Sequence, residues 1–162
     1  MKNTNKILLI FCIILTFMTG WLWLKVADLE STVQKQAEPG LYEVMTQMQT
    51  VVHKMSYAID AENSDLLDFY IHELEELSDE LIEADLWYHD HPVGGLTKAM
   101  LIPTIEDLED ALESGNWTDV QAKASILVQS CNSCHISTGY DYVVIQERAE
   151  TNPFNQDFSP LH

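Results

Sequence analysis

The stretch SDLLDFYIHELEELSDEL, residues 64–81, decides the fold class of this chain. Apolar residues recur in it at three- and four-residue steps, which is the period of one face of an α-helix. The opposite face is rich in carboxylates, so the pattern predicts a helix with one buried and one solvated side. Asn63 or Ser64 is suited to cap its start, and we expect the helix to reach about Tyr88. The apolar positions are Leu67, Tyr70, Ile71, Leu74, Leu77 and Leu81.

The same helical period continues on both sides of this stretch. It predicts a helix over residues 41–61, a third over about 96–113 and a fourth over 117–137. Asn116 is placed to cap the fourth helix, and Pro103 either starts the main body of the third or kinks it. Four amphipathic helices with short loops predict an all-α fold, specifically an up-down-up-down four-helix bundle.

The remaining segments read as connections. Residues 89–95, HDHPVGG, form a loop by their proline and glycine content. Residues 138–162 are expected to be an extended tail that packs on the bundle, and only residues 142–145 have a composition that suits a strand.

The N-terminal segment is apolar. Lys2 and Lys6 precede an uncharged run over residues 7–24, long enough to cross a bilayer as one helix. Positive charge before the run predicts a cytoplasmic N-terminus and an exported remainder, that is, a single-pass inner-membrane protein with its folded domain in the periplasm. The alternative is a cleaved signal peptide. The expected organisation is therefore an anchor or signal segment (1–26), a linker (27–40), a bundle (41–137) and a tail (138–162).

The charge balance is strongly acidic. Against 26 Asp and Glu residues stand 8 Lys and Arg, which gives a formal net charge of −18. Nucleic acid is excluded as a partner, because binding phosphates requires Lys and Arg. An acidic surface can instead steer a basic protein partner, or serve only as a solvated face.

One motif carries chemistry. Cys131-Asn132-Ser133-Cys134-His135 has the spacing of covalent haem attachment, in which both thiols form thioethers and the histidine binds iron. A structural zinc site would need a second Cys/His pair, and a redox dithiol would need a βαβ context. The sequence offers neither, so it predicts one covalent haem c held by Cys131 and Cys134, with His135 as an axial ligand.

A helical bundle with this motif near the end of its last helix resembles the cytochrome c-prime group of four-helix cytochromes. The stretches CNSCHISTGY (131–140), VVIQ (143–146) and NPFNQDF (152–158) are also similar to a group of poorly characterised bacterial cytochrome c-like proteins. His53-Lys54-Met55 and His72-Glu73-Leu74 belong to the same resemblance. The chain departs from the c-prime pattern in its long tail, its N-terminal segment and its histidine-rich first two helices.

The resemblance implies that the residue facing the distal side of the iron lies on the first helix. His53, Met45 and Met48 are the candidates for this sixth ligand, although methionines at helical spacing are also typical of a packed core. The remaining alternative is an open sixth position. A His or Met ligand suits electron transfer, whereas an open position suits a gas ligand such as NO or CO.

The sequence thus predicts a membrane-anchored periplasmic electron carrier that cycles between Fe(III) and Fe(II), rather than an enzyme. The alternative is a haem protein that binds or senses NO or CO. The expected partners are redox proteins, with a basic surface as the best match, and a homodimer is expected by analogy with bundle cytochromes. His72, His89 and His91 receive no assigned role, and Arg148 is the cation best suited to a haem carboxylate.

Overall fold

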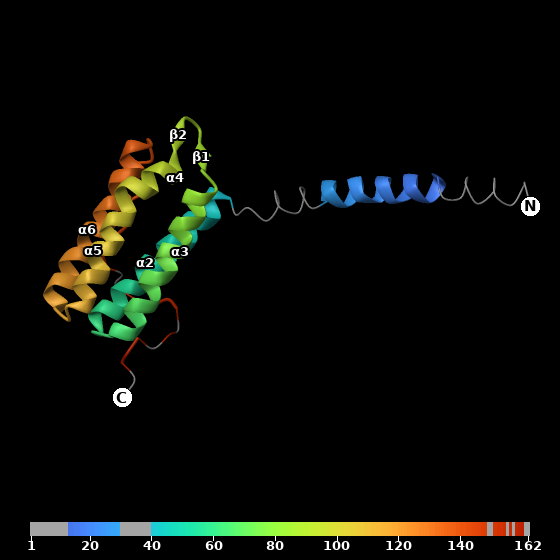
Figure 1. Cartoon of the computed structure of the whole chain (residues 1–162). Coiled ribbons are helices and arrows are strands. Elements are labelled where there is room, and N and C mark those ends of the chain that lie inside the picture. The colour runs from blue at the N-terminus through green and yellow to red at the C-terminus, as the bar shows by residue number, and fades with distance from the viewer. Residues whose placement is uncertain (1–12, 30–39, 149–150, 155, 157, 161–162) are drawn as a thin grey trace, which may run out of the picture. The chain divides into compact units, whose positions relative to one another are not determined.

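The computed structural model describes residues 13–29, 40–148, 151–154, 156 and 158–160. The chain divides into two units at Pro39 and Gly40. In the first unit residues 13–29 are helical (Figure 1), and no helix of the described residues is both long enough and apolar enough to cross a membrane. Residues 7–12 of the expected run lie outside the described residues.

Four long helices make up most of the described part of the second unit: α2 (Leu41–Asp60), α3 (Ser64–Glu83), α5 (Ile102–Glu113) and α6 (Trp117–Ser137). Helix α2 packs on α3, α3 on α5, α5 on α6, and α6 returns to α2. Consecutive long helices run in opposite directions (Figure 1), so the end of α6 lies at the same end of the unit as the start of α2. The all-α class is confirmed.

The core lies along the shared axis of these helices. The apolar positions predicted for residues 64–81 are all buried in α3, and each helix contributes fully buried side chains. Burial of one such side chain is worth roughly 1.5–3 kcal/mol, and this term holds the helices together. The largest fully buried apolar side chains are Val44, Leu67, Ile71, Leu74, Leu81, Ile105, Leu108, Val120 and Leu127.

Both predicted helix caps are present. The Asn63 side chain accepts a hydrogen bond from the Leu66 amide at 3.1 Å, and so satisfies one of the free donors at the start of α3. Asn116 accepts from the Thr118 and Asp119 amides at 3.2 and 3.4 Å at the start of α6.

The connection between α3 and α5 differs from the expected loop. Helix α3 ends at Glu83 rather than near Tyr88, and Asp85 follows with a φ of 43°, which ends a right-handed helix. Strands β1 (Trp87–Tyr88) and β2 (His91–Pro92) then pair as a short antiparallel hairpin.

After the hairpin the chain is helical again, in three consecutive segments. Helix α4 (Val93–Leu96) is followed by a π-helical turn, η1 (Thr97–Leu101), and by α5. Pro103 lies at the start of α5, where its missing amide hydrogen costs little. Of the two expectations for Pro103, the start of the main helix is therefore correct.

The segment after α6 packs back on the first two helices. The Tyr57 hydroxyl donates to the Thr151 carbonyl, Gln156 donates to the Tyr70 hydroxyl at 2.6 Å, and Asn63 donates to the Phe158 carbonyl at 3.0 Å. Residues 142–145 form no strand, because their backbone groups bond to α6 side chains and to a turn instead of to a partner strand.

Candidate haem site

The two motif cysteines lie in the last two turns of α6, half-buried and free of any disulfide. Their three-residue spacing puts both thiols on one face of the helix. That face borders a cavity of about 60 Å³ that both cysteines and His135 line. Its other walls come from α2, α3 and η1, and they include Met45, Met48, Leu74 and Met100. We call this space the inner cavity.

A larger cavity of about 290 Å³ begins at the same residues and is called here the outer cavity. Tyr88 and His91 of the hairpin and Tyr140 after α6 help to form its wall. Five residues line both cavities: Met45, Gln49, Cys134, His135 and Ile145. The two cavities thus meet beside His135. Their combined volume falls within the range of small-molecule and cofactor pockets, whose lower end is about 300 Å³.

A backbone hydrogen bond holds the ring of His135 in one orientation. Its Nδ1 lies 2.7 Å from the carbonyl oxygen of Val143. Because a carbonyl oxygen can only accept a hydrogen bond, this contact places the proton on Nδ1. In the neutral ring the lone pair is then on Nε2, and the carbonyl fixes the orientation of the ring.

The residues that supply this carbonyl form a short segment, 140–145, here called the strap. Its start is held by hydrogen bonds from the Tyr140 amide to the His135 carbonyl at 2.7 Å and from the Val143 amide to the Tyr140 carbonyl at 2.8 Å. Its end is held by Asn132, whose side chain bonds to both backbone groups of Ile145. The strap therefore closes the side of the cavities next to the motif.

Burial sets the state of the thiols. It raises the pKa of Cys131 to about 11, with a smaller contribution from Cys134, and burial also raises the pKa of Cys134. The reactive cysteine of a redox dithiol has a lowered pKa instead, since the thiolate is its nucleophile. Neither motif thiol has the lowered pKa that is typical of such a cysteine.

The structure places the three α2 candidates for the sixth ligand in different surroundings. Met45 lines both cavities with His135, and Met48 lines the inner cavity. His53 lines neither, because it packs against the rings of Tyr57 and Phe154 at centroid distances of 5.5 and 5.2 Å. Five residues after Met48, His53 is turned by roughly 140° around a helix of 3.6 residues per turn.

Three further residues of the cavity walls could not be placed from the sequence. Met100 comes from the π-helical turn, and His91 and Tyr88 come from the hairpin. The Tyr88 and Tyr140 rings lie 5.7 Å apart, and the hydrogen bond between their hydroxyls raises the pKa of Tyr140 to about 12. Only the clustering of His, Pro and Gly over residues 89–95 marked this region in the sequence.

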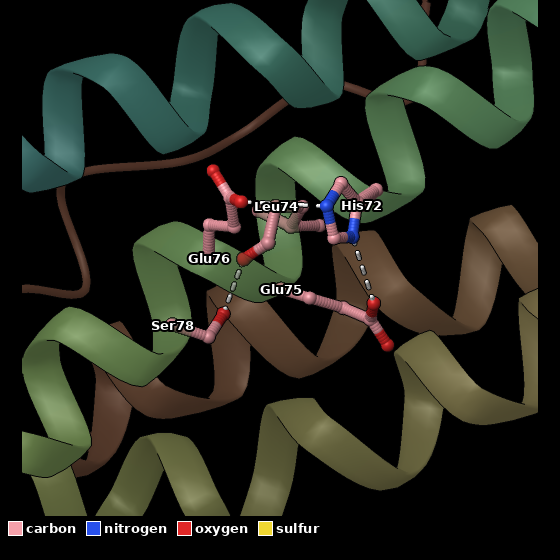
Figure 2. A network of polar contacts seen from close by, with 5 residues as sticks. All are labelled: His72, Leu74, Glu75, Glu76 and Ser78. Carbon is pink, nitrogen blue, oxygen red and sulfur yellow. Dashed lines mark hydrogen bonds and ion pairs between the residues drawn. The ribbon is translucent and has the colours of Figure 1, made fainter.

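His72 lies away from this site, on the exposed face of α3. Figure 2 shows its ring nitrogens directed at two carboxylates, 3.8 Å from Glu75 and 3.3 Å from Glu76. On the same helix the buried Ser78 hydroxyl donates to the Leu74 carbonyl at 2.7 Å. His72 is an exposed residue that lines neither cavity, and exposed pairs of this kind contribute little to stability.

The other polar candidates are engaged elsewhere. His89 is exposed and stacks edge-on against Tyr88 at a centroid distance of 4.5 Å. Arg148 pairs with Asp60 at 2.5 Å and lines a separate cavity between α2 and α6. Within residues 13–29 and 40–148 and the described tail positions, no three His, Cys, Asp or Glu side chains form a metal-binding group.

The chain matches no protein-family model, and comparisons with curated proteins and with solved structures found no significant similarity.

Proposed function

We propose that this chain is a c-type cytochrome that binds one haem covalently and carries electrons. The observation that carries the proposal is the hydrogen bond from His135 Nδ1 to the Val143 carbonyl, which leaves Nε2 free beside two thiols and two adjoining cavities. Cys131 and Cys134 would form the thioethers, and His135 would hold the iron. When bound, the haem supplies a one-electron Fe(III)/Fe(II) couple.

The geometry favours Met45 as the sixth ligand over Met48 and His53. Met45 lies on a rigid helix and lines the space common to both cavities, while His53 is turned toward the tail. A thioether is a soft ligand that favours ferrous iron, so this arrangement suits a carrier of relatively high potential.

Antiparallel packing brings the end of α6 next to the start of α2, which is compatible with a haem held between the motif and α2. We place the haem unit outside the cytoplasm, on the periplasmic side of the inner membrane. This placement rests on Lys2 and Lys6 ahead of the apolar run, and on the export that haem attachment of this type requires in bacteria.

The partner that best fits this carrier is a redox protein with a basic surface. The excess of carboxylates over cations attracts such a surface and raises the rate of encounter, an effect that salt screens. A second copy of the chain, as in the bundle cytochromes, is compatible with the same function.

Binding of NO or CO is the second candidate function. It requires a sixth iron position that no side chain of α2 fills. The two functions differ in whether Met45 occupies the sixth position.

The test is an absorption spectrum of the full chain matured in a host that attaches haem c. We expect the reduced protein to be low-spin and unaffected by CO. Met45→Leu should become high-spin and bind CO, whereas His53→Gln should leave the spectrum unchanged. Met55→Leu serves as the matched control, since Met55 is equally part of α2 and is buried away from both cavities.

A wild type that is high-spin and shifts readily with CO would favour the gas-binding function. A high-spin spectrum in His53→Gln alone would assign the sixth position to His53 and contradict the role given to Met45.

A further inference from the structure

Asn132 occupies the first variable position of the motif. Its side chain holds the strap through two hydrogen bonds, which its place in the sequence does not predict. Its Nδ2 donates to the Ile145 carbonyl at 2.9 Å, and its Oδ1 accepts from the Ile145 amide at 2.7 Å. The side chain thereby pairs with one residue through both backbone groups, as a neighbouring strand would. These two hydrogen bonds fix which residue of the strap lies opposite Asn132.

His135 contacts the strap from the same face of α6, three residues after Asn132. Its partner is Val143, two residues before Ile145. Only one residue separates Val143 from Ile145, so fixing both backbone groups of Ile145 restricts the direction in which the Val143 carbonyl can point. A slip of one residue would turn that carbonyl away from Nδ1.

We propose that Asn132 is a positioning residue for His135, and that it sets how strongly His135 binds iron. The proposal rests on the proposed haem-binding function. A hydrogen bond from Nδ1 to a carbonyl makes Nε2 a stronger electron donor, which favours ferric iron and lowers the reduction potential. Loss of Asn132 should therefore move the potential in the positive direction.

The other attachments of the strap do not depend on Asn132. The Tyr140 amide still bonds to the His135 carbonyl, and the Val143 amide still bonds to the Tyr140 carbonyl. The strap should thus stay near α6 when Asn132 is replaced, and the change should be confined to Ile145 and to the direction of the Val143 carbonyl. The freed groups of Ile145 are only half-buried, so water can reach them and the fold should survive.

The experiment compares haem-loaded full-length Asn132→Ala and Asn132→Leu with the wild type. Leucine matches the shape of asparagine without its hydrogen bonds. Ser133→Ala is the matched control, because the exposed Ser133 bonds only to the Gln129 carbonyl of its own helix. The measurements are the midpoint reduction potential and hydrogen exchange at the Ile145 amide.

Both Asn132 variants should show a more positive potential and exchange at Ile145 faster by roughly tenfold or more, because the amide is no longer protected. Ser133→Ala should change neither. If Asn132→Ala does not fold, Asn132→Leu decides the comparison. An unchanged potential in the folded variants would overturn the proposal and leave Asn132 as a structural clamp. A wild type without covalent haem would overturn the proposed function itself.

Discussion

Cys131 shows how burial controls the chemistry of a single residue in this protein. The side chain packs against the core at the end of α6, and taking its thiolate out of water raises the pKa to about 11. The thiol is therefore neutral near neutral pH. It is therefore a poor nucleophile in the folded chain.

We predict that iodoacetamide labels Cys131 slowly in the folded chain before haem attachment. Below the pKa the thiolate fraction, and with it the rate, should rise about tenfold for each pH unit until the pH approaches the raised pKa. Peptide mapping after labelling at about pH 8, with and without urea, measures the rate at Cys131 apart from the other cysteines. Equal rates in the folded and unfolded chain would contradict the burial of this thiol.

Some site residues could be predicted from the sequence and others could not. Cys131, Cys134 and His135 stand in one local motif, so their spacing alone suffices. The choice between Met45 and His53 depends on the rotation of α2 against α6, which a border position in an apolar stripe does not define. His91 and Met100 were missed because a hairpin and a π-helical turn bring them to the cavities.

At the scale of elements, the connection between α3 and α5 depends on the close approach of Gly94 to α3. A Cβ at Gly94 would lie 2.4 Å from the Leu81 carbonyl oxygen and 3.3 Å from Ile82 Cα. Both are backbone atoms that cannot move without shifting the helix. The neighbouring Gly95 has only an ordinary contact, 3.7 Å from the Pro92 Cβ.

Gly94→Ala should therefore destabilise the domain by roughly 1–3 kcal/mol, as overpacking does. Gly95→Ala should be neutral or slightly stabilising, because alanine favours helix. Urea unfolding followed by circular dichroism measures both. A Gly94→Ala variant as stable as Gly95→Ala would show that α4 does not pack on α3 as described.

Asn63 joins two elements, since it caps α3 and also holds the C-terminal segment through Phe158. Asn63→Asp keeps the acceptor for the Leu66 amide and loses the donor to the Phe158 carbonyl, whereas Asn63→Ala loses both. We expect Asn116→Ala, which removes only a cap, to cost about 1 kcal/mol. Asn63→Ala should cost more.

Limited proteolysis separates the two roles of Asn63. Cleavage near residues 151–160 should be faster in both Asn63 variants than in the wild type or in Asn116→Ala. Equal cleavage in all four proteins would mean that the bond to Phe158 does not hold the segment.

The helices themselves could be predicted because their signals are local. The period of residues 64–81 and the caps at Asn63 and Asn116 depend on neighbours three or four positions away. The end of α3 could not be predicted from the sequence, because Asp85 adopts a positive φ and Gly94 packs on Leu81 through a tertiary contact. No strand was expected at residues 87–92 for the same reason.

For the whole molecule, the order of the helices determines where the site forms. Antiparallel packing brings the end of the last long helix to the start of the first, so the motif of α6 faces Met45 of α2. The segment after α6 then closes the cavities and continues onto α2 and α3. Under the proposed function, this scaffold would hold the haem between α6 and α2.

The intact mass of the protein tests the central claim most directly. The full chain, exported from a host that attaches haem c, should exceed its polypeptide mass by that of one haem, and Cys131→Ala/Cys134→Ala should lack the increase. A wild type with the mass of the polypeptide alone, recovered from a host that loads other c-type cytochromes, would contradict the account.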